Sequence, residues 1–363
     1  MRHVLMIGWL MLVPVATQAQ VPDDRGVEEE RVAGAAAPRP PSVANERLAS
    51  SATAGQAARP VAAPPPDGPR RRGSMVGYID DAIVSSKVRI RFETGLHDRV
   101  PDRAEFFYAK CGCYRDVGPT NAAFDPAAPG PRPGAANDLN FQQFFVLGEY
   151  AFTDRISAFA ELPTRWIQPQ SFVPGTGGGF PDHGGVGDLR AGVKVAVLTT
   201  SRQTLAAQGQ VFMPTGNASN GLGTDHASLQ PSLLLYQRVS DRLVVESQVG
   251  DWHPFGGSAG IPTTSSDTFA GDVFFYGIGP SYEVYRTDTV RVAPVVELVG
   301  WHVVNGFQTG TASDAGGTNI VNLKFGARVA WNPESSLYVG YGHALTSSSW
   351  YDDIVRFEYR YSF

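Results

Sequence analysis

The sequence has few charged residues, few cysteines and no long apolar run. Only 18% of the residues are charged, and the formal net charge is −5, so we expect no binding to nucleic acid, which requires basic surfaces. Two cysteines are too few for a disulfide scaffold or a zinc module with several cysteines. A bundle of transmembrane helices is also excluded, because each helix would need about 20 apolar residues in a row.

Glycine and aromatic residues, in contrast, are abundant. The chain of 363 residues contains 40 Gly, 20 Phe and 13 Tyr. High glycine and aromatic content with few charges is typical of an all-β protein, and one class of all-β proteins lies in membranes.

The N-terminus has the layout of a secretory signal peptide, expected over residues 1–19. A basic start at 1–3 is followed by an apolar stretch at 4–15 and by small residues at 16–19. The apolar stretch is too short to span a bilayer as a helix. A buried N-terminal helix is the alternative. Export would expose both cysteines to an oxidising compartment.

Residues 20–74 are rich in proline and alanine and are expected to form a disordered linker. The segments 33–41 and 64–66 are examples of this composition. Such a stretch cannot bury enough apolar surface to offset the entropy of ordering. A solvated tail is the favoured interpretation, and a periplasmic spacer, a cell-wall contact or a plug entering a pore are the alternatives.

From about residue 75 onward the hydrophobic pattern has a period of two. In 87–97, the apolar residues Val88, Ile90 and Phe92 alternate with charged residues, and 353–363 repeats the pattern up to the last residue. Apolar-out and polar-in alternation is the pattern of a transmembrane antiparallel β-barrel. We therefore predict an outer-membrane barrel over residues 75–363.

About 12 strands are expected, an even number, as in single-chain bacterial barrels. They span 87–97, 139–152, 155–167, 185–198, 203–214, 227–239, 242–253, 270–285, 289–302, 319–332, 336–346 and 353–363. Tight turns rich in Asp, Asn, Ser and Pro alternate with longer loops, which places both ends of the barrel chain on the periplasmic side. A soluble sandwich or propeller is the structural rival.

Several stretches resemble the motifs of a known family. They are G-V-G-D-L-R-A-G-V-K at 185–194, M-P-T-G at 213–216, G-L-G at 221–223, E-Y-A-F-T-D at 149–154 and E-L-P at 161–163. The sequence resembles the outer-membrane transporter-like barrels named for the meta-pathway of phenol degradation.

The motifs of this resemblance cover roughly residues 139–260. It implies uptake or passage of small solutes, aromatic ones among them, and it brings no catalytic residues. The long loop 98–138 and the proline-rich tail depart from the family's usual pattern. These segments are therefore candidates for a plug or for an additional role.

Strand parity assigns a set of charged residues to the barrel interior. The expected pore-lining residues are Lys87, Arg89, Arg91, Glu93, Glu161, Arg165, Asp188, Arg190, Lys194, Glu297, Lys324, Arg328, Arg356, Glu358 and Arg360. The same parity places Glu149, Glu246, Arg155, Arg238, Arg291 and Asp272 inside. Basic residues outnumber acidic ones in this set, which favours small anions in a narrow pore. The alternative is a network of ion pairs that fills the barrel.

Trp252 and Trp301 each precede a histidine at the end of a strand that runs outward. Parity turns both indoles inward near the outer mouth, where an aromatic solute could stack on them. An interfacial aromatic girdle, with the indoles at the level of the lipid headgroups, is the alternative that we favour. A register slip of one residue exchanges the two arrangements. Trp166 and Trp331 face lipid by the same parity.

We expect no cofactor, no metal site and no catalytic activity. Cys111 and Cys113 lie in the long loop, where a disulfide is an option although its ring would be strained; His97 is the nearest further metal ligand. For a barrel hydrolase, the best candidate residues are His343 with the serines at 347–349, without a Gly-x-Ser-x-Gly elbow.

The sequence thus predicts a barrel of the bacterial outer membrane that takes up or passes small solutes, anionic or aromatic ones included. A structural barrel without transport is the alternative, followed by a hydrolase. The expected partners are the membrane lipid, the solute, and the barrel-insertion machinery, which would recognise the C-terminal segment ending in Phe363.

Overall fold

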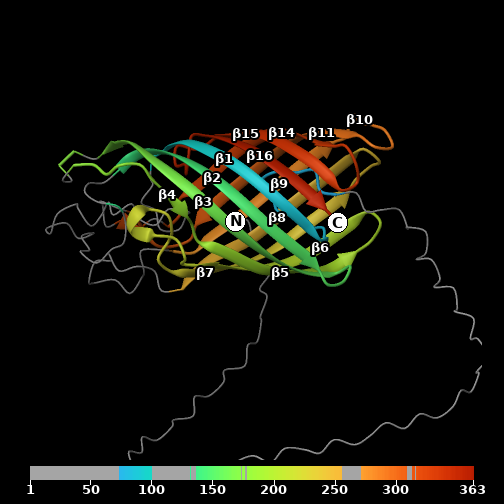
Figure 1. The fold of residues 1–363 in the computed structure, drawn as a ribbon, viewed down its shortest axis with the longest axis horizontal. Coiled ribbons are helices and arrows are strands. Elements are labelled where there is room, and N and C mark those ends of the chain that lie inside the picture. The colour runs from blue at the N-terminus through green and yellow to red at the C-terminus, as the bar shows by residue number, and fades with distance from the viewer. Residues whose placement is uncertain are drawn as a thin grey trace, which may run out of the picture. The chain divides into compact units, whose positions relative to one another are not determined.

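Alternating apolar and polar side chains give extended strands, and these pair into a closed antiparallel β-barrel (Figure 1). The structure is a computed structural model that describes residues 73–99, 131, 136–172, 174–175, 178–255, 271–308, 313–314 and 316–363. Neighbouring strands along the chain pair with each other, and the last strand returns to pair with the first. In the described part of the chain, twelve strands complete the ring, as predicted.

The barrel strands are β1 (Lys87–Asp98), β2 (Ala136–Ala151), β3 (Ile156–Phe172), β5 (Leu189–Thr199), β6 (Gln203–Met213), β7 (Ala227–Arg238), β8 (Leu243–Phe255), β9 (Val273–Tyr282), β11 (Arg291–Val303), β14 (Asn319–Ala330), β15 (Ser335–Ala344) and β16 (Asp353–Ser362). Short additional pairings are made by β4 (His183–Val186) with β3, by β10 (Tyr285–Arg286) with β11, and by β12 (Phe307–Gln308) with β13 (Ser313–Asp314). A 3-10 turn, η2, spans Ala218–Asn220.

The hairpin of β2 and β3 is longer than the sequence predicts. Ala136 pairs with Phe172, whereas the expected strands begin at 139 and end at 167. The extension contains two register shifts, and its residues 168–171 are polar apart from one proline, which removes the period of two. The pattern therefore stops before the backbone pairing does.

The tight turns at one end of the barrel share a side-chain cap. Thr153, Thr200 and Ser240 each accept hydrogen bonds on their hydroxyl oxygen from backbone N–H groups two and three residues later. Thr287 accepts from the backbone three residues on, and the amide oxygen of Asn332 accepts from the next two available N–H groups. These bonds mimic a backbone turn and hold the strands in register.

The outer face of the barrel is apolar. The alternate residues Val88, Ile90 and Phe92 of β1 are exposed, and so are the indoles of Trp166 and Trp331, as parity predicts. A closed ring satisfies every strand edge, and an apolar outer surface suits hydrocarbon, so the barrel lies in the bacterial outer membrane with lipid around it.

None of the helices in the described residues is long and apolar enough to cross a membrane.

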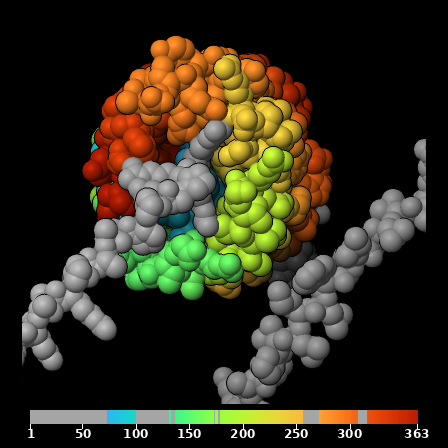
Figure 2. All heavy atoms as spheres, turned by 90° about the vertical axis from the view of Figure 1, so that its right-hand side faces the viewer, coloured from blue at the N-terminus to red at the C-terminus, as the bar shows by residue number. Residues whose placement is uncertain are grey.

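Residues 73–86, here called the lumen segment, precede β1 and lie inside the ring of strands, where Figure 2 shows blue atoms. Met75, Val76 and Ile79 are buried against the barrel interior. At one end of the segment the Ser86 carbonyl accepts from the Phe363 N–H at 3.0 Å, and at the other the Ser74 carbonyl accepts from Arg360. The segment thus enters and leaves at the end with the tight turns.

Candidate functional site

The barrel encloses a cavity of about 200 Å³ above the lumen segment. Most of the predicted pore-lining residues line it: Lys87, Arg89, Arg91, Glu93, Glu161, Arg165, Asp188, Arg190, Lys194, Lys324 and Arg356. Tyr78, Asp80 and Asp81 of the lumen segment line it as well. The lining contains eight basic and six acidic side chains, so its formal charge is positive.

One carboxylate organises the basic side chains of the first strands. Glu161 on β3 accepts from Arg89 at 2.9 Å, from Arg190 at 3.0 Å and from Arg91 at 3.3 Å. The guanidinium of Arg91 also lies over the ring of Phe145, 3.9 Å from its centre. Three cations around one anion leave a local excess of positive charge that faces the cavity.

A second group of ion pairs lies near the tight turns. The ammonium of Lys87 is 2.7 Å from Asp81 and 3.1 Å from Glu149, and Lys194 is 3.2 Å from Glu149. Burial alone would raise the pKa of the Asp81 carboxyl, but the charges of Lys87 and Arg360 hold it well below its usual range. Asp81 therefore stays ionised and ties the lumen segment to β1 and β16.

Four of the predicted pore-lining residues do not line the cavity; they are Glu297, Arg328, Glu358 and Arg360. Glu297, Arg328 and Arg360 bind the lumen segment, and Glu358 pairs with the two arginines. The Glu297 carboxylate accepts from the N–H groups of Gly77, Tyr78 and Ile79 at 3.2, 2.9 and 2.8 Å. Arg328 donates to the carbonyls of residues 75 and 76 and to Glu358.

Part of the outer end of the cavity is aromatic and apolar. Trp252 on β8 is only 8% exposed and lines the cavity together with Trp301 on β11. Both indoles therefore lie on the inner face, as parity places them, and not on the outer face, where a girdle would place them. Phe275 and Ile354 also line the cavity at this end.

Asp188 explains why the glycine-rich stretches at 185–194 and 213–223 occur together. Its carboxylate accepts from the N–H groups of Gly216 at 3.0 Å and Thr224 at 2.7 Å, and from the Thr224 hydroxyl at 2.9 Å. A Cβ added to Gly223 would lie 2.4 Å from the Asp188 oxygen. The motif residues thus fix a loop onto β5, a structural role that sequence reasoning missed.

Two of the wider parity assignments are wrong. Arg155 lies in the turn between β2 and β3 and is exposed, because the strand begins one residue later than expected. Asp272 precedes β9, whose first residue Val273 faces inward, so the Asp272 side chain points outward.

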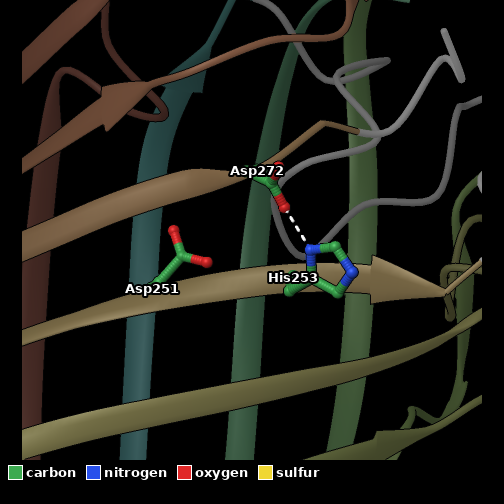
Figure 3. Close-up of side chains that lie close together, drawn as sticks. All are labelled: Asp251, His253 and Asp272. Carbon is green, nitrogen blue, oxygen red and sulfur yellow. Dashed lines mark hydrogen bonds and ion pairs between the residues drawn. The ribbon is translucent and has the colours of Figure 1, made fainter. Parts of the chain in front are cut away.

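Asp272 instead takes part in a cluster on the outer face (Figure 3). Asp251, His253 and Asp272 offer ligand atoms within 4.8 Å of one another. The Asp272 carboxylate, however, already accepts from Asn305 at 3.1 Å and contacts His253 Nδ1. Asp272 and His253 are therefore already paired in this structure.

The same pairing recurs at three other strand ends. Nδ1 of His97 lies 3.0 Å from Asp138, and Nδ1 of His302 lies 2.8 Å from Asn319. Nδ1 of His343 lies 2.8 Å from Asp353. Each histidine reaches an oxygen near the start of the next barrel strand, so these contacts pin neighbouring strands together.

The candidate hydrolase residues do not form a nucleophile–base pair. His343 is exposed on the outer face of β15 and contacts Asp353. Among the described residues, no hydrogen bond joins His343 to the serines at 347–349, and Ser349 donates to Asp352 instead. Cys111, Cys113, the signal peptide at 1–19 and the linker up to residue 72 lie outside the described residues.

No model of a known protein family matches the sequence, and no curated protein matches it. Solved structures do match the barrel. The COG4313 outer membrane channel from Pseudomonas putida F1 is 13% identical, with 82% of this chain and 99% of that chain covered and a TM-score of 0.48. The β domain of the Bordetella autotransporter BrkA is 14% identical, with 77% and 100% covered and a TM-score of 0.45.

The NanC porin is 9% identical, with 77% of this chain and 99% of that chain covered and a TM-score of 0.40. At these values the likeness concerns barrel architecture and not a solute.

Proposed function

We propose that this barrel passes small solutes across the outer membrane through its lumen, with a preference for anions and for solutes with an apolar or aromatic body. The observation that carries the proposal is the cavity, which is positively charged on one side and aromatic at its outer end. Fixed charges in a narrow, poorly hydrated space act strongly on a passing ion. The resemblance to the meta-pathway barrels supports small aromatic solutes.

A solute can pass through the lumen only if the lumen segment moves. It is held by side chains of the wall and not by strand pairing, because its N–H groups bind Glu246, Glu297 and Gln248. Hydrogen bonds of this kind can exchange without opening the barrel. A solute that enters the outer cavity would therefore cross when the segment shifts towards the periplasm.

A structural barrel without transport is the second candidate. The buried ion pairs around Glu161 and Glu358 and the lumen segment all fill the interior, as in small barrels whose lumen is solid. This candidate predicts no solute flux in any condition.

Liposome swelling separates the two candidates. Vesicles carrying the purified protein are placed in isosmotic sodium benzoate, arabinose or lysine hydrochloride at neutral pH. We expect swelling in benzoate to be several-fold faster than in lysine hydrochloride, because the lining is positively charged. Protein-free vesicles give the background. Swelling no faster than this background with all three solutes would favour the structural barrel.

We also propose that the barrel-insertion machinery recognises the C-terminal strand. Phe363 is 67% exposed, and its ring stacks on that of Tyr361 with centroids 6.3 Å apart. We expect Phe363→Ala to lower the fraction of chain folded in the outer membrane, measured by heat-modifiable migration. Phe357→Ala removes an exposed phenyl from β16 and serves as the control. Equal losses in both variants would argue against recognition of the terminus.

A further inference from the structure

We propose that Lys324, with the hydroxyl groups of Tyr78 and Tyr351, binds the carboxylate of a small monocarboxylate whose apolar body lies against Trp301. The inference deepens the proposed function by naming a binding site and a solute class, and it rests on that function only for its physiological meaning.

Lys324 is a buried lysine that faces the cavity. Its side chain is 2% exposed, and its ammonium donates to the Tyr351 hydroxyl at 2.7 Å. It forms no ion pair with a carboxylate in the part of the chain that the structure describes. An ammonium has three donors, so two remain for a ligand. Burying a cation without an anion is costly, and a bound carboxylate would offset that cost.

The other lysines of the cavity differ from Lys324. Lys87 and Lys194 both pair with Glu149, at 3.1 and 3.2 Å. Arg356, close to Lys324, is held by Glu93 at 2.6 Å. The amine of Lys324 is therefore available to an anionic ligand.

Aromatic groups surround the ammonium. It lies 3.8 Å from the centre of the Tyr78 ring, 5.2 Å from that of Tyr351 and 5.8 Å from that of Trp301. These contacts stabilise the ammonium form of the side chain. The three rings also line the cavity.

Tyr78 adds a second donor. Its hydroxyl is buried and has no hydrogen-bond partner among the described residues. Burial raises the pKa of Tyr78 and that of Tyr351 above their usual value, so both groups keep their protons. A carboxylate that accepts a hydrogen bond from Lys324 would also accept one from the Tyr78 hydroxyl, and the buried hydroxyl would then have a partner.

The apolar wall next to these donors limits the rest of the ligand. Trp301 packs against a buried cluster that includes Trp252, Tyr351 and Ile354. The cavity of about 200 Å³ is smaller than the pockets for drug-sized ligands, which begin near 300 Å³. A compact ring or short aliphatic chain with one carboxylate fits both constraints.

The test is calorimetric titration of the purified full-length protein in detergent with sodium benzoate, with benzyl alcohol as a neutral ligand of similar shape. We expect benzoate to bind at least about tenfold more tightly than benzyl alcohol, and Lys324→Met to lose about tenfold in benzoate affinity. Tyr78→Phe removes only the hydroxyl and should lose several-fold. Lys194→Met removes a lumen cation that has a partner and should lose clearly less than Lys324→Met.

Heat-modifiable migration confirms that each variant is folded, and Tyr78→Phe keeps the test intact if Lys324→Met does not fold. No binding of benzoate to the wild type, equal affinities for the two ligands, or wild-type affinity in both variants would overturn the site. Swelling without a loss of affinity in the variants would leave passage standing and refute the site. Loss of affinity in the variants, together with no vesicle swelling by the wild type, would support the binding site and refute passage.

Discussion

Replacing Gly279 by leucine is expected to raise the conductance of the barrel several-fold in planar bilayers. Gly279 lies on β9 and faces inward, where a Cβ would lie 3.1 Å from side-chain carbons of Val76 and Ile79 and 2.8 Å from Glu297. A leucine needs the volume that these two residues of the lumen segment occupy. Because the segment is held by wall side chains, it can leave, whereas the paired strand cannot.

The control is Ile278→Leu, one residue earlier on the same strand. Ile278 is 50% exposed on the outer face, so this change leaves the lumen untouched. Glu297→Gln offers a second route that adds no volume. It removes the charge that three backbone N–H groups and the Tyr338 hydroxyl share, at about 1.5–3 kcal/mol for each charge-assisted bond.

Both lumen variants should also make the lumen segment more accessible to protease in intact vesicles. Wild-type conductance in Gly279→Leu, although its lumen segment has become accessible to protease, would mean that the segment does not obstruct ion flow.

The barrel could be predicted from the sequence because lipid and lumen impose opposite demands on neighbouring side chains. Val88, Ile90 and Phe92 face outward, and the charged residues between them face inward. This alternation occurs between adjacent residues, so it can be recognised in each strand separately. Number, order and direction of the strands follow from it together with the spacing of the turns.

The lumen segment could not be predicted in the same way. Many of its contacts are with residues more than a hundred positions away, such as Glu246, Glu297 and Arg328, and it has no periodicity of its own. One signal was nevertheless present. Leu234 and Val295 face inward by parity and are fully buried or nearly so, although a water-filled lumen would call for polar groups there.

Apolar residues on the inner face indicate that another part of the chain packs against them. Ala82 and Ile83 cover Leu234, and Val76 and Ile79 cover Val295. The sequence also predicts an excess of positive charge on the inner face, but it does not predict how these charges pair. Parity gives the number of charges on the inner face, but it cannot show that one carboxylate, Glu161, takes three guanidinium groups.

Substituting Glu358→Gln should lower the free energy of unfolding by about 3–5 kcal/mol. Glu358 is 1% exposed and lies 2.6 Å from Arg328, 2.9 Å from Arg360 and 3.9 Å from Arg89. Glutamine keeps the size of the side chain but removes its charge, so the buried guanidinium groups lose their common anion. The loss is measured by urea titration of the protein in vesicles, with tryptophan fluorescence as the signal.

Asp241→Asn is the matched control, because it also removes a carboxylate that pairs with an arginine. The Asp241 side chain is 81% exposed and lies 3.2 Å from Arg238, and such surface pairs contribute less than about 1 kcal/mol. The double variant Arg328→Met with Glu358→Gln removes one of the uncompensated cations and should recover part of the loss. Equal losses for Glu358→Gln and Asp241→Asn, or no recovery in the double variant, would show that the interior is hydrated well enough for water to replace the carboxylate. In that case the lumen around Arg328 would be open to solvent and not sealed by the lumen segment.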